Sequence, residues 1–324
     1  MKALVCDRPG SPEGLKFEEV ERPVVPEDGV LVRVHASSAN PVDLFPMSAM
    51  GYLMGGLKRH VLGTDFAGTV EALGKDVREF RPGDEVFGGR RGAFAEYVCV
   101  GARGAVARKP ANVPFEQAGT VVVAAVTALQ ALRDHGQVRR GQRVLINGAS
   151  GGVGTFAVQI AKALGTEVTA VCSPRNIEMV RSLGADRVID YTREDFTRSG
   201  ERYDLLVDIA GSHSWSEYRR VLQSDGTFVG VGVAAVQHGK GGGWRALRHF
   251  VQLRLATRKT SQRVVRLFIA NLTTEGLAYL GELMEAGKVS PVIERTYEMD
   301  EIPAALRFMI DGHTQGKLAI RIAP

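Results

Sequence analysis

The chain has 324 residues, of which 44% are hydrophobic and 24% charged, a composition typical of a globular protein large enough for two domains. Its net charge of +5 comes from one segment, because eight basic and no acidic residues lie between Asp225 and Glu275. This distribution excludes the evenly basic surface of a nucleic-acid-binding protein. The three cysteines lie far apart and form no CxxC pair, which excludes a disulfide framework and a zinc knuckle and favours a reducing compartment, the cytoplasm.

The N-terminal third of the chain is predicted to be β-rich. Short apolar segments that are separated by Gly and Pro are typical of strands joined by turns. We expect strands in GVLVRVHASS, GTDFAGTVEALG, FRPGDEVFGG and AFAEYVCV.

From Pro114 onward, helices and strands are expected to alternate. Residues 114–136 have the length and spacing of one helix, which Gly136 ends. The apolar strands that follow are bounded by helices, and this predicts an α/β protein with a doubly wound parallel sheet beside the β-rich domain. The tail from residue 277 reads as helix, strand, helix and strand. The strands expected in the parallel sheet are 143–149, 167–172, 186–191, 203–210, 226–233 and 263–270, and its helices are 153–165, 176–184 and 215–223.

The segment ASGGVG matches a dinucleotide-binding fingerprint, with Ala149 in the first glycine position and Gly151 and Gly154 in the other two. It follows an apolar strand and opens a helix, which is the context that distinguishes this motif from an ordinary glycine-rich turn. Glycines let backbone N–H groups approach a pyrophosphate, and the helix dipole favours the same anion. The residues expected to hold the pyrophosphate are Ala149, Ser150, Gly151, Gly152 and Val153.

The end of the second strand of this sheet indicates which dinucleotide is bound. A site for NADH places an acidic residue there, about 20 residues past the glycines, to accept hydrogen bonds from the ribose. This chain has VCSPRN instead, with the hydroxyl of Ser173 and the guanidinium of Arg175. Both groups suit the 2′-phosphate of NADPH, and Tyr191 is expected against the adenosine. The alternative is that Arg175 is a solvated residue at a helix start.

Several segments of the chain resemble the zinc-independent branch of the medium-chain dehydrogenase/reductase superfamily, the quinone oxidoreductase and ζ-crystallin-like proteins. The resemblance implies a GroES-like substrate domain over residues 1–117, completed by 275–324, and a Rossmann NADPH-binding domain over 118–274. It also implies a homodimer formed through the last Rossmann strand, here 264–270. The segments that carry it are SSANPVDLF, GTDFAGTVEALG, RPGDEVFG, AFAEYV, TALQAL, INGASGGVGTFAVQIAK, LGADRVIDY and GHTQGKLAI.

The resemblance also assigns roles to residues outside the glycine loop. It places Asn40 beside the nicotinamide ribose and the substrate, and it makes Tyr52 a donor to the developing oxyanion. A second position that is often tyrosine in quinone oxidoreductases is Phe45 here, so solvent is the alternative proton source. A turn at Asn40-Pro41 and a turn before the terminal strand are the alternative explanations for Asn40 and Lys317. The further cofactor contacts implied are Thr127, Gly211, Val231, Val233 and Lys317.

The sequence predicts no metal. By the same resemblance, Asn40, Thr64 and Asp65 stand where zinc alcohol dehydrogenases have their cysteine, histidine and glutamate. Zinc needs three or four thiolate, imidazole or carboxylate ligands, and this set does not supply them. Without a Lewis acid, hydride addition is best suited to an acceptor whose product anion is delocalised.

We therefore expect an NADPH-dependent, metal-free reductase of quinones or α,β-unsaturated carbonyls. Two alternatives remain: an NADPH-binding structural, sensory or membrane-associated module without turnover, and an oxidoreductase of a pathway-specific ketone or alcohol. The basic insertion 238–262 contains an amphipathic stretch, 244–259. This stretch has three alternative roles: a contact with a membrane surface, a substrate lid or a dimer contact.

Overall fold

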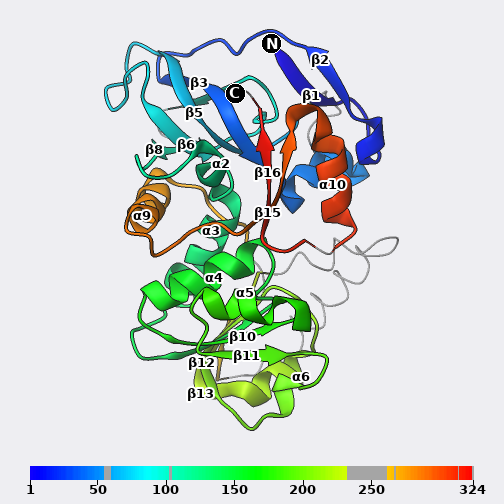
Figure 1. Cartoon of the computed structure of the whole chain (residues 1–324), viewed down its shortest axis with the longest axis vertical. Helices are drawn as coiled ribbons and strands as arrows, with labels where there is room; N and C mark the ends of the chain where they lie inside the picture. Colours follow the sequence, from blue (N-terminus) through cyan, green and yellow to red (C-terminus); the bar gives the residue numbers. More distant parts are fainter. Residues whose placement is uncertain (55–59, 102–103, 232–260, 266–267, 313, 323–324) are drawn as a thin grey trace. The chain divides into compact units, whose positions relative to one another are not determined.

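The computed structural model describes residues 1–54, 60–101, 104–231, 261–265, 268–312 and 314–322 (Figure 1). The chain divides into two compact units. Unit 1 comprises Met1–Val126 together with Asn271–Pro324, and unit 2 comprises Thr127–Ala270. Both ends of the chain therefore belong to unit 1.

Unit 1 is built on a seven-stranded sheet in the order β15-β16-β3-β5-β6-β8, with β7 also paired to β3. All its pairs are antiparallel except β15 with β16. A smaller sheet has the order β2-β1-β4. The strands are β1 (Lys2–Cys6), β2 (Lys16–Glu19), β3 (Gly29–Ser38), β4 (His60–Val61), β5 (Asp65–Leu73), β6 (Glu85–Gly89), β7 (Tyr97–Gly101), β8 (Ala105–Arg108), β15 (Ile293–Glu298) and β16 (Lys317–Arg321).

The C-terminal segment completes the unit 1 sheet. β16 pairs antiparallel with β3, so that Ala319 lies opposite Ser38 although the two are far apart in sequence. The core of the unit includes Phe66, Phe94 and Leu306, each fully buried. The helices of unit 1 are α1 (Ala49–Met54), α2 (Phe115–Ala118), α9 (Thr274–Glu285) and α10 (Ile302–Ile310), and α3 (Val122–Leu129) continues from unit 1 into unit 2.

Unit 2 is a six-stranded parallel sheet in the order β11-β10-β9-β12-β13-β14. Counted along the chain this order is 3-2-1-4-5-6, that of a Rossmann fold, and it confirms the predicted fold class. The order reverses between β9 and β12. The elements are β9 (Arg143–Asn147), α4 (Gly152–Ala163), β10 (Glu167–Cys172), α5 (Ile177–Ser182), β11 (Arg187–Asp190), β12 (Tyr203–Asp208), α6 (Trp215–Tyr218), β13 (Leu222–Gly230) and β14 (Arg263–Val265).

Several of the predicted elements differ in extent from the structure. The helix expected over 215–223 is α6 followed by a 3-10 helix, Arg219–Val221, and it stops there because Leu222 already pairs with Tyr203 of β12. The helix expected over 114–136 is divided into α2, α3 and a π-helix, Gln130–His135. It breaks at Gly119, where an added Cβ would lie 3.0 Å from the backbone of Ala36, so the chain turns there to pass close to β3. Of the strand expected over 263–270, the described residues Arg263–Val265 form β14 and pair with β13, whereas residues 268–270 lie in no strand.

Candidate functional site

The glycine loop follows β9 and opens α4, as the sequence predicts. Its glycines have three different local roles. Gly148 has a φ of +93°, a conformation that favours glycine, and it makes the tight turn. A Cβ on Gly151 would meet only the carbonyl oxygen of Gly148, at 3.9 Å, so the space in front of Gly151 is open. A Cβ on Gly154 would lie 2.2 Å from that same oxygen, so Gly154 permits α4 to pack closely against the loop.

Ala149, at the first position of the motif, is fully buried, and the tight turn is made by Gly148 just before it. Backbone hydrogen bonds anchor the loop, since the N–H groups of Gly148 and Ala149 both donate to the carbonyl of Val171 in β10. The N–H groups of the first turn of α4 have no partner within the helix. Together with the helix dipole and the open space at Gly151, they fit the pyrophosphate of a dinucleotide.

Two polar residues that sequence reasoning missed join the carboxyl ends of β9 and β12. Asn147 ends β9, and its Nδ2 donates to Oδ1 of Asp208 (2.9 Å) and to the hydroxyl of Ser212 (3.1 Å). Oδ1 of Asp208 also accepts from the N–H of Gly211 (3.0 Å), and its carbonyl accepts from the N–H of Val231 (2.8 Å). Ligands of doubly wound sheets bind where the strand order reverses. The sequence does contain a signal for these two residues, because Asn147 and Asp208 are each the polar residue that ends an apolar strand.

The turn after β10 carries the residues predicted for the adenosine phosphate. Ser173 is half-buried and Arg175 is exposed, whereas Asn176 is only 3% exposed. Tyr191 follows β11, is 59% exposed, and donates its N–H to the carbonyl of Cys172. An acidic group also lies at this edge, because Asp190 ends β11 opposite Cys172.

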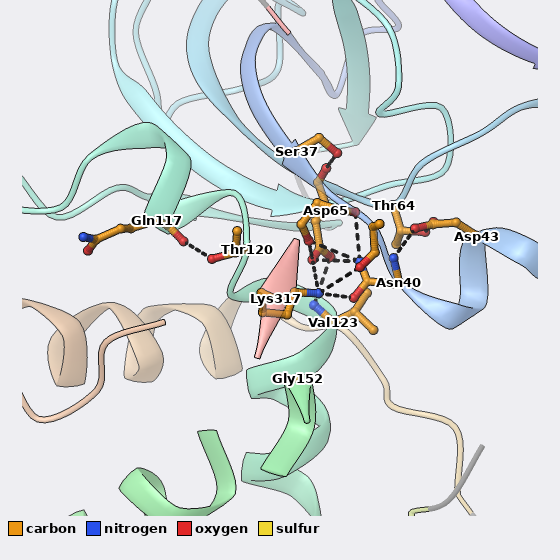
Figure 2. A network of polar contacts seen from close by, with 12 residues as sticks. Ser37, Asn40, Asp43, Thr64, Asp65, Gln117, Thr120, Val123, Gly152 and Lys317 are labelled. Carbon is orange, nitrogen blue, oxygen red and sulfur yellow. Dashed lines mark hydrogen bonds and ion pairs between the residues drawn. The ribbon is translucent and has the colours of Figure 1, made fainter. Parts of the chain in front are cut away.

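The second polar cluster lies in unit 1 and is shown in Figure 2. Oδ2 of Asp65 accepts from the hydroxyl of Ser38 (2.8 Å) and from Nδ2 of Asn40 (3.0 Å), and its Oδ1 accepts from the N–H of Val123 (3.0 Å). Nζ of Lys317 lies 2.5 Å from Oδ1 of Asn40 and 3.9 Å from Oδ2 of Asp65. Strands β3, β5 and β16 bring these side chains together.

Asp43 extends this cluster from the 3-10 helix Pro41–Met47. One carboxylate oxygen accepts from the backbone N–H of Asn40 (2.8 Å), and the other accepts from the hydroxyl of Thr64 (2.7 Å). Burial raises the pKa of Asp43 to about 7 and also raises the pKa of Asp65. Burial lowers the pKa of Lys317, although the carboxylates of Asp65 and Asp43 oppose that change.

The structure places the remaining predicted residues in different surroundings. Asn40 is 1% exposed, and its side-chain oxygen and nitrogen both bind partners within the cluster. Thr127 is half-buried on α3. The side chain of Tyr52 in α1, Val233 and the stretch 244–259 all lie outside the described residues. In the described part of the chain, no helix is long and apolar enough to cross a bilayer.

The unit 1 cluster does not fit a zinc ion. The amide of Asn40 and the hydroxyl of Thr64 are not ligands that structural or catalytic zinc sites use. The ammonium of Lys317 would in addition repel a divalent cation bound to Asp65. Across the described residues, no three His, Cys, Asp or Glu side chains are grouped so that they could hold a metal.

Comparison with known proteins establishes the family. Residues 26–111 match a model described as the alcohol dehydrogenase GroES-like domain, and residues 183–320 match one described as zinc-binding dehydrogenase. The mouse mitochondrial NAD(P)H oxidoreductase RTN4IP1 is 35% identical over 99% of this chain and 89% of its own length. The chloroplastic quinone-oxidoreductase QR1 of Triphysaria versicolor is 34% identical over 96% of this chain and 95% of its own. The chain belongs to the quinone oxidoreductase family of the medium-chain dehydrogenase/reductase superfamily. It is therefore an oxidoreductase.

Solved structures of this family agree over the full length of the chain. The quinone oxidoreductase of Coxiella burnetii superposes with a TM-score of 0.84 at 30% identity and covers 100% of this chain and 99% of its own. The Escherichia coli quinone oxidoreductase complexed with NADPH also gives a TM-score of 0.84, at 25% identity, and covers 99% of this chain and 100% of its own.

A further relative by sequence is the 2-methylene-furan-3-one reductase of Solanum lycopersicum, which is 31% identical over 100% of this chain and 80% of its own length.

Proposed function

We propose that this oxidoreductase is an NADPH-dependent, metal-free reductase of a quinone or an α,β-unsaturated carbonyl compound. The observation that carries the proposal lies in unit 2. There, the glycine loop leaves open space at Gly151 before the first turn of α4. The turn that follows the neighbouring strand β10 carries the hydroxyl of Ser173 and the guanidinium of Arg175 in place of a carboxylate. The first feature suits a pyrophosphate and the second suits a further phosphate.

The residues proposed to hold NADPH divide between its two ends. The loop Ala149–Val153 and Gly148 would hold the pyrophosphate, and Ser173, Arg175 and Tyr191 would hold the adenosine 2′-phosphate. When bound, NADPH supplies a hydride. Asp190 at this edge is an ionised carboxylate, since the hydrogen bonds that its Oδ1 accepts from the hydroxyl (2.7 Å) and the N–H (2.9 Å) of Thr192 lower its pKa. Nε of Arg193 lies 3.7 Å from Oδ2 of Asp190 and partly offsets the charge. The E. coli quinone oxidoreductase, a similar structure, is complexed with NADPH, and this supports the proposed preference for NADPH over NADH.

The acceptor follows from the chemistry of the product anion. Reduction of a quinone or an enone leaves a hydroquinone anion or an enolate, whose charge is delocalised and which a hydrogen-bond donor can stabilise. Reduction of a saturated ketone leaves a localised alkoxide, which calls for a Lewis acid or a strong proton donor. The poor fit of zinc to Asn40, Thr64 and Asp65 supports the conjugated class. So do the relatives named for quinones and for a methylene-furanone.

Two residues of unit 1 are proposed to serve the reaction. Tyr52 is proposed to donate a proton to the developing oxyanion. Asn40 is proposed to act as a positioning residue, because Lys317 and Asp65 bind its side-chain atoms.

The experiment is to follow oxidation of NADPH and of NADH with three acceptors: a benzoquinone, a linear enone and the matching saturated ketone. We expect NADPH oxidation with the quinone or the enone and slower or no oxidation of NADH. Tight NADPH binding without turnover on any acceptor would favour a non-catalytic module. Turnover on the saturated ketone alone would favour a ketone or alcohol oxidoreductase.

We also propose that the protein is a cytoplasmic homodimer. β14 is the last strand of the unit 2 sheet, and among the described strands it has only β13 as a neighbour, so its outer edge is available for pairing with a second copy. The separated cysteines support a reducing compartment. Light scattering of the purified protein tests the dimer, and a mass of one chain would exclude it.

A further inference from the structure

Asn176 is the buried residue of the turn that follows β10. It is 3% exposed, while Arg175 before it is exposed. Its backbone N–H donates to the carbonyl of Ser173 (3.0 Å), and its Nδ2 donates to the hydroxyl oxygen of Ser173 (3.0 Å). Two hydrogen bonds therefore join Asn176 to Ser173.

The side chain of Asn176 does not cap the helix that follows it. Asn176 is the N-cap residue of α5, where the side-chain oxygen normally accepts from a backbone N–H of the first turn. No such hydrogen bond forms here. Oδ1 of Asn176 is instead buried without a partner. Because an unpartnered buried acceptor destabilises a fold, this arrangement needs a reason.

The hydrogen bond from Asn176 fixes the direction in which Ser173 can donate. A serine hydroxyl has one proton and two lone pairs, and Nδ2 of Asn176 occupies a lone pair. The proton of Ser173 therefore points away from Asn176, and in the described part of the chain no acceptor is recorded for it. Oγ of Ser173 does not cap the following 3-10 helix either. The hydroxyl is left as a donor.

We propose that Asn176 is a positioning residue that sets the coenzyme preference by holding Ser173 as a hydrogen-bond donor toward the 2′-phosphate. This inference rests on the proposed use of NADPH. A phosphate that is fully ionised can only accept hydrogen bonds, whereas the ribose 2′-hydroxyl of NADH can both donate and accept. A serine held as a donor therefore favours NADPH over NADH, and a serine held as an acceptor would not.

The test reverses the hydrogen bond with little change of shape. In Asn176→Asp a carboxylate replaces the amide and accepts the proton of Ser173, so the hydroxyl turns inward. The measured quantity is the ratio of the dissociation constants for NADH and NADPH, from quenching of protein fluorescence. We expect the ratio to fall about tenfold or more in Asn176→Asp, the effect of one lost hydrogen bond to a charged group. Asn176→Ala, which frees the hydroxyl to rotate, should lower it by a smaller factor.

Repeating the Asn176→Asp substitution in the Ser173→Ala variant distinguishes the effect of the hydrogen-bond direction from the effect of the added negative charge. In Ser173→Ala the ratio falls, and adding Asn176→Asp to Ser173→Ala should lower it little further, because the residue acts through Ser173. An equal fall in both backgrounds would show a charge effect and overturn the inference. Thermal unfolding of each variant without coenzyme identifies loss of fold. If Asn176→Asp does not fold, Asn176→Ala with and without Ser173→Ala completes the same cycle.

The outcomes distinguish this inference from the proposed function. An unchanged ratio in Asn176→Asp and Asn176→Ala, together with a lowered ratio in Arg175→Ala, would overturn the role of Asn176 and leave the use of NADPH intact. A protein that binds NADH at least as tightly as NADPH would overturn both.

Discussion

The ammonium of Lys317 lies 2.5 Å from the side-chain oxygen of Asn40 and 3.9 Å from the carboxylate of Asp65, and all three side chains are buried. Removing one partner of a buried ion pair leaves an uncompensated charge. We expect Lys317→Met to lower the free energy of unfolding by about 3 kcal/mol. Urea denaturation measures it.

Two control variants make this result specific. Lys288 is an exposed lysine of the same unit, and Lys288→Met should change the free energy of unfolding by about 0.5 kcal/mol or less. Asp65→Asn combined with Lys317→Met removes both charges and should recover part of the loss. If Lys317→Met were as stable as the unsubstituted protein, the pair would contribute nothing to the fold.

The carboxyl of Asp43 should make stability depend on pH. Burial raises its pKa from 3.8 to about 7 in the folded protein, so between these values the folded state binds the proton and the unfolded state does not. Its contribution to stability is therefore complete below pH 3.8 and is lost as the pH rises through 7.

The measurement compares Asp43→Asn with the unsubstituted protein by urea denaturation from pH 4 to 8. The asparagine can still bind the N–H of Asn40 and the hydroxyl of Thr64, but it does not titrate. The stability of the unsubstituted protein relative to the variant should fall as the pH rises, by about 4 kcal/mol at most. A difference that stays constant with pH would mean that Asp43 is ionised throughout.

Substitution of two glycines of the loop should have different effects: at Gly151 it should weaken coenzyme binding, and at Gly154 it should lower stability. Gly151 has an extended backbone, with φ −82° and ψ 179°, that any residue adopts, and the space beside it is open. Gly151→Val should therefore melt close to the unsubstituted protein and yet bind NADPH at least about tenfold more weakly, because the side chain occupies the place of the pyrophosphate.

Gly154→Ala is the matched comparison. Its Cβ would lie 2.2 Å from the carbonyl oxygen of Gly148, and we expect a loss of about 1–3 kcal/mol in the free energy of unfolding. Thermal unfolding and an NADPH titration of both variants check the pair. Equal melting temperatures for the two variants would contradict the distinction between the open and the packed glycine.

Arg175 should contribute to the preference for the phosphorylated coenzyme. A hydrogen bond between charged groups contributes about 1.5–3 kcal/mol, so Arg175→Ala should weaken NADPH binding about tenfold or more and leave NADH binding nearly unchanged. Arg181 lies in the helix α5 that follows, pairs with Glu178, and provides the control Arg181→Ala. If NADH and NADPH binding weakened equally in Arg175→Ala, Arg175 would not contact the extra phosphate.

The sequence predicted unit 2 well because its signals are local. An apolar strand followed by a glycine-rich helix start has a regular pattern, and β9, α4 and β10 lie where that pattern indicates. Local signals also misled. Residues 114–136 are apolar enough for one helix, yet the chain turns at Gly119 to pass against Ala36, a contact that is distant in sequence. The motif begins at Ala149, and the positive φ of Gly148, the residue before it, is a feature that the motif does not contain.

The cluster around Asp65 lay beyond sequence reasoning for a related reason. Asn40, Asp65 and Lys317 were each named, but their meeting depends on the register of β16 against β3, which no local pattern contains. The bridge from Asn147 to Asp208 was accessible in principle, because both residues end apolar strands. Which neighbours they bind follows from the order of the strands in the sheet.

The place of β16 beside β3 has a consequence for biosynthesis. Lys317 leaves the ribosome after all of unit 2, so for most of its synthesis the nascent chain carries Asp65 without its cationic partner and Asn40 without its hydrogen-bond donor. Unit 2 can form all six of its strands, β9–β14, during that time, whereas the seven-stranded sheet of unit 1 begins with β3 and is complete only when β16 has been synthesised.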